Sequence, residues 1–173
     1  MTASEKAIRA KSKAHIQYKL ANGTNVPGTT TIVGILDKPA LKFWANKIGL
    51  QGIKMSDYVD ALANVGKAAH AAILAELSGN AAESAFVDLA PDIRSLAENC
   101  YLSYRAWANR HTLVPISMET PLVSESLRYG GTADFVGIVD GELELIEFKT
   151  GGIWPEHFIQ LAAYAQLLEE NKV

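Results

Sequence analysis

The sequence predicts one domain of mixed α and β structure, α/β or α+β, built on one mixed sheet and spanning residues 1–173. Two observations carry this expectation. Apolar residues recur at helical spacing between residues 37 and 111, with proline and glycine at the breaks. After residue 113 the pattern changes to alternation, and an Asp-Gly pair marks a hairpin. The 49% hydrophobic content suits a globular core.

The chain opens on a predicted hairpin and helix. The segment "HIQYKL", residues 15–20, alternates and precedes the turn-rich "ANGTNVPG", which indicates a strand and a hairpin. The next segment, "TTTIVGIL", fits either a strand or a short helix. A helix is expected in "DKPALKFWANKIGLQG", because Asp37 can cap it and Pro39 suits its first turn.

Two longer helices are expected next. Ser56 is placed to cap the first, with Asp57 in its first turn, and Gly79 would end it. The second is "PDIRSLAENCYLSYRAWANRH", which opens with Pro91. Three aromatic residues recur at helical spacing along it, and such a stripe is more often core than a platform for stacking bases. They are Tyr101, Tyr104 and Trp107.

A three-stranded antiparallel meander and a final helix complete the expected fold. The strands are "ISMETPLVSESL", "GTADFVGIV" and "LELIEFK", joined by turns at "RYGG" and "DGE". The helix is "WPEHFIQLAAYAQLLEEN", with Pro155 in its first turn. Its core side is expected to consist of Phe158, Leu161, Ala162, Ala165 and Leu168.

Charge and cysteine content narrow the classes of function. Residues 1–54 hold nine Lys or Arg against two acids, whereas residues 55–173 hold seven against seventeen. This polarity suits a basic surface for phosphate with acids kept for a metal, although terminal lysines often serve solubility only. The single cysteine, Cys100, excludes an internal disulfide and a thiolate cluster. Without a signal core or an apolar run of ~18 residues, a cytoplasmic, intracellular protein is expected.

Three charged residues interrupt the apolar strands. Glu147 and Lys149 are two apart and therefore share a strand face. If the last two strands pair around Asp140-Gly141, Glu147 falls opposite Asp134. Two buried like charges repel unless a positive charge lies between them, and Mg²⁺ or Mn²⁺ would supply it. The alternatives are a turn-capping Asp134 and an exposed salt bridge worth ~0–1 kcal/mol.

Four short motifs in order give the chain a family resemblance. "VGKAAH", "GGTADF", "EFK" and "QLAAY" together resemble the PD-(D/E)XK nuclease superfamily, in its RecB-like and phage exonuclease branch. "VPGTTTIVGILDKPALKFWA" also looks like the leader of phage-encoded members, so the similarity runs from about residue 15 onward. It implies a restriction-endonuclease-like catalytic core in residues 114–173, after a basic part (1–54) and a helical part (56–110). The family core continues beyond its last motif, so a truncated core or one completed by a partner is expected.

The resemblance implies a role for each residue at the predicted site. His70, Asp134 and Glu147 would be metal ligands, with the backbone carbonyl of Phe148 as a further oxygen. Lys149 would be the catalytic lysine beside Asp134 and Glu147. Judged without the family, His70 is more simply a core histidine at the border of an apolar helix stripe.

Supporting roles are also implied. Gln160 and Tyr164 lie one turn apart on a helix face and would orient Lys149 or touch the DNA backbone; otherwise they form a polar flank. Glu119 would support the ligands from behind or is an exposed edge residue.

The implied function is metal-dependent hydrolysis of DNA phosphodiesters, with Mg²⁺ or Mn²⁺ as cofactor. An exonuclease acting on ends of linear DNA, in phage biology, recombination or repair, is the first expectation. The alternatives are a structure- or site-specific endonuclease and a non-catalytic DNA-end-binding module of a recombination complex. DNA, a recombination protein and further copies of the chain are the expected partners, with no membrane.

Overall fold

The computed structural model describes residues 16–36 and 38–173 and confirms the mixed α and β class. The helices are α2 (Thr29–Val33), α3 (Pro39–Leu50), α4 (Met55–Leu77), α5 (Pro91–Ala108) and α6 (Pro155–Asn171), with a 3₁₀ helix η1 (Ala82–Phe86). The strands are β1 (Tyr18–Lys19), β2 (Asn25–Val26), β3 (Leu113–Met118), β4 (Pro121–Ser124), β5 (Tyr129–Thr132), β6 (Phe135–Val139) and β7 (Glu142–Ile146). None of these helices combines the length and apolar content needed to cross a bilayer.

The strands form separate antiparallel sheets rather than the one mixed sheet that was expected. Their orders are β1-β2, β3-β6-β7 and β4-β5. Each pairing among the named strands is antiparallel, and a lone parallel bridge joins Gly28 to Gly130. The predicted meander is confirmed in β3-β6-β7, but its first turn is not at "RYGG" as expected: the turn lies at residues 125–128, and Tyr129–Thr132 form β5. Its last turn is the predicted Asp140-Gly141 pair, with φ of 52° and 96° as a tight hairpin requires.

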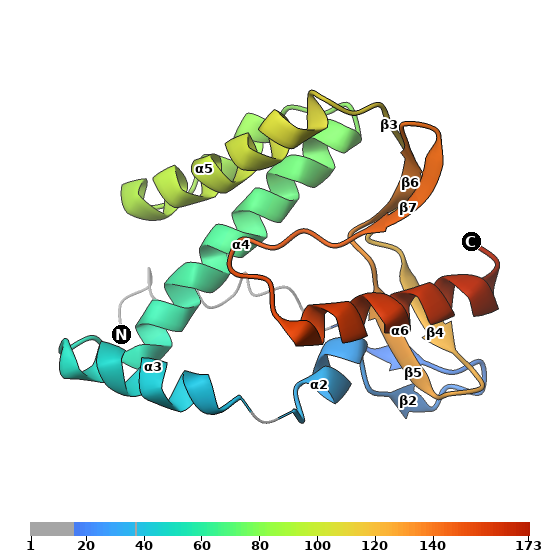
Figure 1. Cartoon of the computed structure of the whole chain (residues 1–173), viewed down its shortest axis with the longest axis horizontal. Coiled ribbons are helices and arrows are strands. Elements are labelled where there is room, and N and C mark those ends of the chain that lie inside the picture. The colour runs from blue at the N-terminus through green and yellow to red at the C-terminus, as the bar shows by residue number, and fades with distance from the viewer. Residues whose placement is uncertain (1–15, 37) are drawn as a thin grey trace.

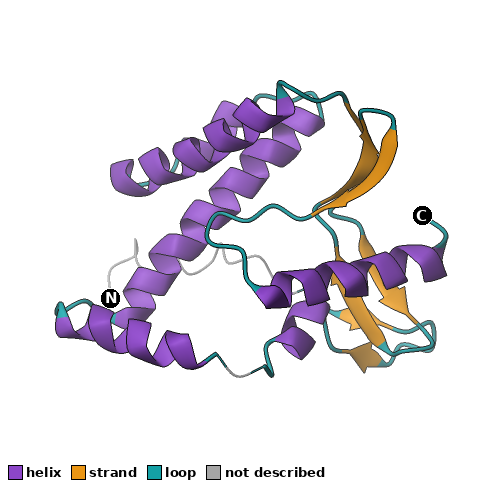
Figure 2. Cartoon of the chain, in the orientation of Figure 1, coloured by secondary structure: helices purple, strands orange, loops and turns teal. Residues whose placement is uncertain are grey.

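The first two predicted strands are each divided in two, because they form a two-stranded ribbon that bends. The strand predicted at 116–127 divides into β3 and β4, and the strand predicted at 131–139 divides into β5 and β6 (Figure 2). At the bend the Glu119 amide donates to the Ala133 carbonyl over 3.1 Å. Glu119 has φ of 44°, a left-handed conformation that disfavours non-glycine residues by about 1–3 kcal/mol. The bend therefore sets Glu119 beside Asp134.

The third predicted strand is also shorter than expected. β7 ends at Ile146, so "EFK" lies just beyond the sheet instead of within it. This segment runs from the sheet towards α4 and then turns to the start of α6 (Figure 1). Freed from the ladder, it can place successive side chains against different helices.

The N-terminal predictions are mostly confirmed. The short hairpin β1-β2 is present, and the ambiguous segment after it contains the short helix α2. Asp37, the proposed cap, lies outside the described residues. Ser56 is not a cap: α4 begins one residue earlier, and the Ser56 hydroxyl donates to Asp57 instead. Gly79 follows the end of α4 with φ of 74°, as its predicted role requires.

Two hydrophobic clusters flank the segment after β7. One lies between α4, η1 and α5, with buried Val65, Ala68, Ala72, Ala82, Phe86 and Ala97. The other joins α6 to the bent ribbon, with buried Tyr129, Ala133, Val136, Tyr164 and Leu167. The buried face of α6 was predicted wrongly, because Phe158 is 64% exposed whereas Gln160, Tyr164 and Leu167 are buried.

Gly137 of β6 lies where β3 comes close to β6, at the irregularity in their pairing. A Cβ there would lie 2.4 Å from the Val114 carbonyl oxygen and 2.5 Å from the Phe135 ring. We expect Gly137→Ala to lower the free energy of unfolding by about 1–3 kcal/mol, measured by urea denaturation. The control Gly49→Ala in α3, where a Cβ meets nothing within 4 Å, should be neutral or stabilising by up to about 1 kcal/mol. Equal stabilities of the two variants would contradict this packing.

Candidate metal centre

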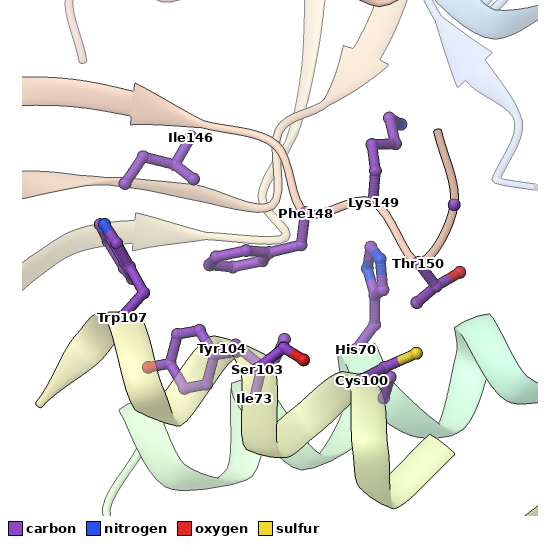
Figure 3. Close-up of a pocket in the computed structure, with 12 residues that line it drawn as sticks. His70, Ile73, Cys100, Ser103, Tyr104, Trp107, Ile146, Phe148, Lys149 and Thr150 are labelled. Carbon is purple, nitrogen blue, oxygen red and sulfur yellow. The ribbon is translucent and has the colours of Figure 1, made fainter. Parts of the chain in front are cut away.

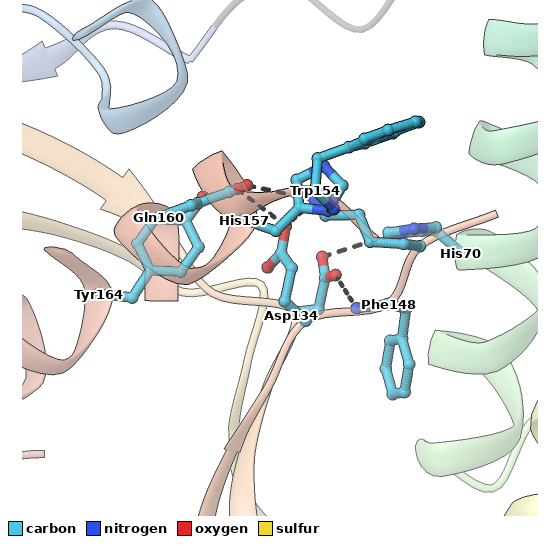
Figure 4. Close-up of polar contacts among 9 residues, drawn as sticks. His70, Asp134, Phe148, Trp154, His157, Gln160 and Tyr164 are labelled. Carbon is cyan, nitrogen blue, oxygen red and sulfur yellow. Dashed lines mark hydrogen bonds and ion pairs between the residues drawn. The ribbon is translucent and has the colours of Figure 1, made fainter. Parts of the chain in front are cut away.

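Four parts of the chain bring the predicted site residues to one place, and Figure 4 labels His70, Asp134, Gln160 and Tyr164 among them. α4 supplies a histidine, the ribbon bend supplies two acids, the segment after β7 supplies an acid and a lysine, and α6 supplies two buried polar residues. These are His70, Glu119, Asp134, Glu147, Lys149, Gln160 and Tyr164. Residues separated by up to 94 positions in the sequence thus meet between the two hydrophobic clusters.

Asp134 fixes the segment after β7 to the ribbon bend. Its Oδ2 accepts a hydrogen bond of 2.7 Å from the Phe148 amide, and its Oδ1 lies 3.4 Å from His70 Nδ1. The register pairs Phe135 with Ile146, so Asp134 and Glu147 follow as the next facing positions. The predicted convergence of these two acids is therefore present in the fold.

Glu147 is a buried carboxylate held against a like charge. Its side chain is only 8% exposed. Burial, followed by the negative charge of Asp134, raises the pKa of Glu147 above its ordinary value of 4.5, and Lys149 offsets only part of this. The Oε2 atom is buried and has no hydrogen-bond partner among the described residues. Such an oxygen is unfavourable unless a bound proton or a cation satisfies it.

The predicted supporting residues hold Lys149 in place. The Lys149 ammonium donates to Glu147 Oε1 over 2.7 Å and to Gln160 Oε1 over 3.2 Å. The Gln160 amide donates to Glu147 Oε1 over 2.9 Å and to the Tyr164 hydroxyl over 2.7 Å. Gln160 and Tyr164 are 6% and 5% exposed, so the alternative of an exposed polar flank is wrong. They act as a buried brace for the Glu147–Lys149 pair.

His70 faces the acids from α4 and is not a fully enclosed core histidine. Its side chain is 25% exposed, and its ring meets the Phe148 ring edge-on at 6.3 Å. Burial by itself would lower the pKa of His70. The ion pair with Asp134 and the charge of Glu147 outweigh burial, and the pKa of His70 is raised above 6.5.

Glu119 is closer to the centre than the sequence indicated. One ligand atom from each of His70, Glu119 and Asp134 lies within 4.8 Å of the others. Glu119 is thus a candidate ligand and not only a support, whereas Glu147 adjoins Asp134 outside this trio. The break of strand alternation at "METP" is the sequence signal that could have singled it out.

His157 is a neighbour of the site that sequence reasoning did not assign. Its Nδ1 accepts the Trp154 amide over 3.2 Å and so caps the start of α6. Burial and the positive charge of Lys149 hold the pKa of His157 below its ordinary value. His157 therefore belongs to the rim of the centre, next to the ammonium.

The donor set fits a hard or borderline divalent cation. Carboxylate oxygens suit Mg²⁺ and Mn²⁺, and a histidine nitrogen suits Mn²⁺ better. Glu147 Oε2 is buried near Asp134 and has no hydrogen-bond partner in residues 16–36 and 38–173, and it is the feature that a cation would satisfy. Comparison of the chain with protein-family models and with curated proteins found no match. The function must therefore be argued from these residues.

The raised pKa values predict how the metal-free protein responds to pH. The folded state retains protons on Glu147 and His70 that the unfolded chain has already released, so stability falls as pH rises from 4.5 to above 6.5. Glu147→Gln should remove the Glu147 share of this loss and be more stable than wild type at pH 7. The measurement is the urea midpoint in EDTA across this pH range. Glu144→Gln, at an exposed position of β7, is the control; a Glu147→Gln curve that parallels wild type would refute the claim.

Proposed function

We propose that this chain is a divalent-metal-dependent deoxyribonuclease with the restriction-endonuclease-like core of the PD-(D/E)XK superfamily, in its RecB-like and phage exonuclease branch. The observation that carries this proposal is the buried approach of Asp134 to Glu147 with the Lys149 ammonium braced alongside. A structural ion pair alone does not account for a second carboxylate or for a buried oxygen that no described residue contacts by a hydrogen bond.

The residues that would hold the cation are Asp134 and Glu147, with His70 and Glu119 as further donors close to Asp134. Mg²⁺ or Mn²⁺ bound there would offset phosphate charge and lower the pKa of a water molecule. The chain's own share is to fix these donors before substrate arrives. The Asp134–Phe148 hydrogen bond and the buried Gln160–Tyr164 pair do so.

Lys149 is suited to meet the phosphate. Two of the three donors of its ammonium group engage Glu147 and Gln160, which leaves one for a phosphate oxygen or for the attacking water. Its side chain is 27% exposed, so substrate can reach it. A fixed positive charge at this place would stabilise the charge that develops on phosphate during hydrolysis.

DNA is the proposed substrate because the site combines anion-binding and metal-binding groups, and because residues 1–54 are strongly basic. Within that part, Lys38 is joined to Glu156 at the start of α6 over 2.7 Å. This ion pair joins Lys38, at the start of α3, to the helix that braces Lys149. The preference for DNA ends rests on the resemblance to phage exonucleases.

Digestion of end-labelled linear DNA tests the proposal. Wild type with Mg²⁺ or Mn²⁺ should degrade the DNA, and EDTA should abolish the reaction. Lys149→Met should lose about 10²–10³ in rate, the usual effect of removing one electrostatic stabiliser. Lys172→Met, the same change at the opposite end of α6, should leave the rate unchanged.

Thermal unfolding establishes that both variants are folded before their rates are compared. Degradation by Lys149→Met at the wild-type rate would eliminate the proposed role of this site. A closed circular DNA separates the modes of attack: an end-directed enzyme leaves it intact and degrades the linearised form, whereas a cut circle identifies an endonuclease.

A further inference from the structure

A cleft of about 370 Å³ opens beside the metal centre, between α4, α5 and the segment that follows β7 (Figure 3). Sites that hold small organic ligands are typically about 300–1,000 Å³ with mainly apolar walls. Aliphatic and aromatic side chains form most of this wall: Ile73, Tyr104, Trp107, Ile146 and Phe148. The cleft therefore suits a flat, largely apolar ligand of modest size.

Three aromatic residues shape this cleft. Phe148 meets Tyr104 edge-on, with ring centres 5.4 Å apart, and Tyr104 lies 6.2 Å from Trp107. Tyr104 is 7% exposed and so belongs to the core, as the sequence pattern indicated. Trp107 and Phe148 are only partly buried and leave ring surface for a ligand.

Two residues connect the cleft to the metal centre. His70 and Lys149 both line it. The His70 ring stands beside Phe148 at the cleft while its Nδ1 lies 3.4 Å from Asp134 Oδ1. The Lys149 ammonium points the other way, towards Glu147 and Gln160. One ligand could therefore place an apolar ring in the cleft and an anion at the ammonium.

We propose that the cleft receives the base of an unpaired DNA nucleotide whose phosphate lies at the metal centre. This inference rests on the proposed nuclease function and narrows its substrate to single-stranded or frayed DNA. A nucleotide joins a flat ring to a phosphate, the pair of groups that the cleft and Lys149 would accommodate. A paired base is stacked in its duplex and must leave the stack to enter.

The wall chemistry further predicts tolerance of base sequence. Stacking on aromatic rings accepts every base, because each has a π-face. The Ser103 hydroxyl at the cleft donates to the Asn99 carbonyl of its own helix. With the Ser103 hydroxyl engaged, the Thr150 hydroxyl is the other one at the cleft, and because the walls are mainly apolar, stacking rather than a set of base-specific hydrogen bonds would govern binding.

Binding measured without hydrolysis tests the cleft. The probe is a short oligodeoxythymidylate labelled at its centre, compared by fluorescence anisotropy in EDTA with the same strand carrying abasic residues at both ends. Wild type should bind the complete strand about tenfold or more tightly than the abasic one. Trp107→Ala and Ser103→Leu should abolish this preference, the first by removing a wall and the second by filling the cleft from an exposed position.

Trp44→Ala is the matched control, because Trp44 of α3 packs on Tyr58 of α4 and does not line the cleft. This variant should keep the preference for the complete strand. Equal binding of both strands by wild type, no binding of either, or a preference retained in both Trp107→Ala and Ser103→Leu would overturn the proposal. If the protein hydrolyses DNA but binds both strands equally, the proposed role of the cleft is wrong and the proposed nuclease function stands. If it prefers the complete strand but hydrolyses no DNA, the nuclease function is wrong and the base-binding site stands.

Discussion

The centre depends on the repulsion between two carboxylates that the fold holds together out of water. The strand register brings Asp134 and Glu147 together. Burial is the larger cause of the raised pKa of Glu147, and the negative charge of Asp134 raises it further. The Lys149 ammonium compensates only one side, through Glu147 Oε1, while Oε2 remains buried without a hydrogen-bond partner in the described part of the chain. An arrangement of this kind disfavours the metal-free fold and favours binding of a cation.

The architecture around this pair keeps it from relaxing. The ribbon bends where Glu119 adopts a left-handed conformation, and the bend turns Asp134 towards α4. Because β7 stops at Ile146, the following residues alternate between the centre and the cleft: Phe148 packs on α5 while Lys149 reaches α6. The hydrophobic clusters on either side hold α4 and α6 in place. The unfavourable features, the left-handed backbone of Glu119 and the buried pair of carboxylates, therefore lie between two well-packed regions.

Local patterns predicted much of this fold, and three-dimensional context decided the rest. The Asp140-Gly141 turn and the proline starts of α5 and α6 were predictable because they depend on neighbouring residues alone. The bend at Glu119 was missed, because "METP" was assigned to one continuous strand and the residues that pair with it, 133–139, lie elsewhere in the chain. Gln160 was left out of the predicted core face of α6 because its side chain is polar. It is buried because it makes hydrogen bonds to Glu147 and Lys149, which are distant from it in the helix pattern.

The most direct measurement of the central claim is anomalous X-ray diffraction from crystals of the protein soaked in Mn²⁺. We expect one strong manganese peak within ~2.0–2.6 Å of carboxylate oxygens of both Asp134 and Glu147, with His70 or Glu119 completing the ligand set. A map with no peak at these acids, while they remain side by side and hydrogen-bonded only to protein groups, would contradict the account.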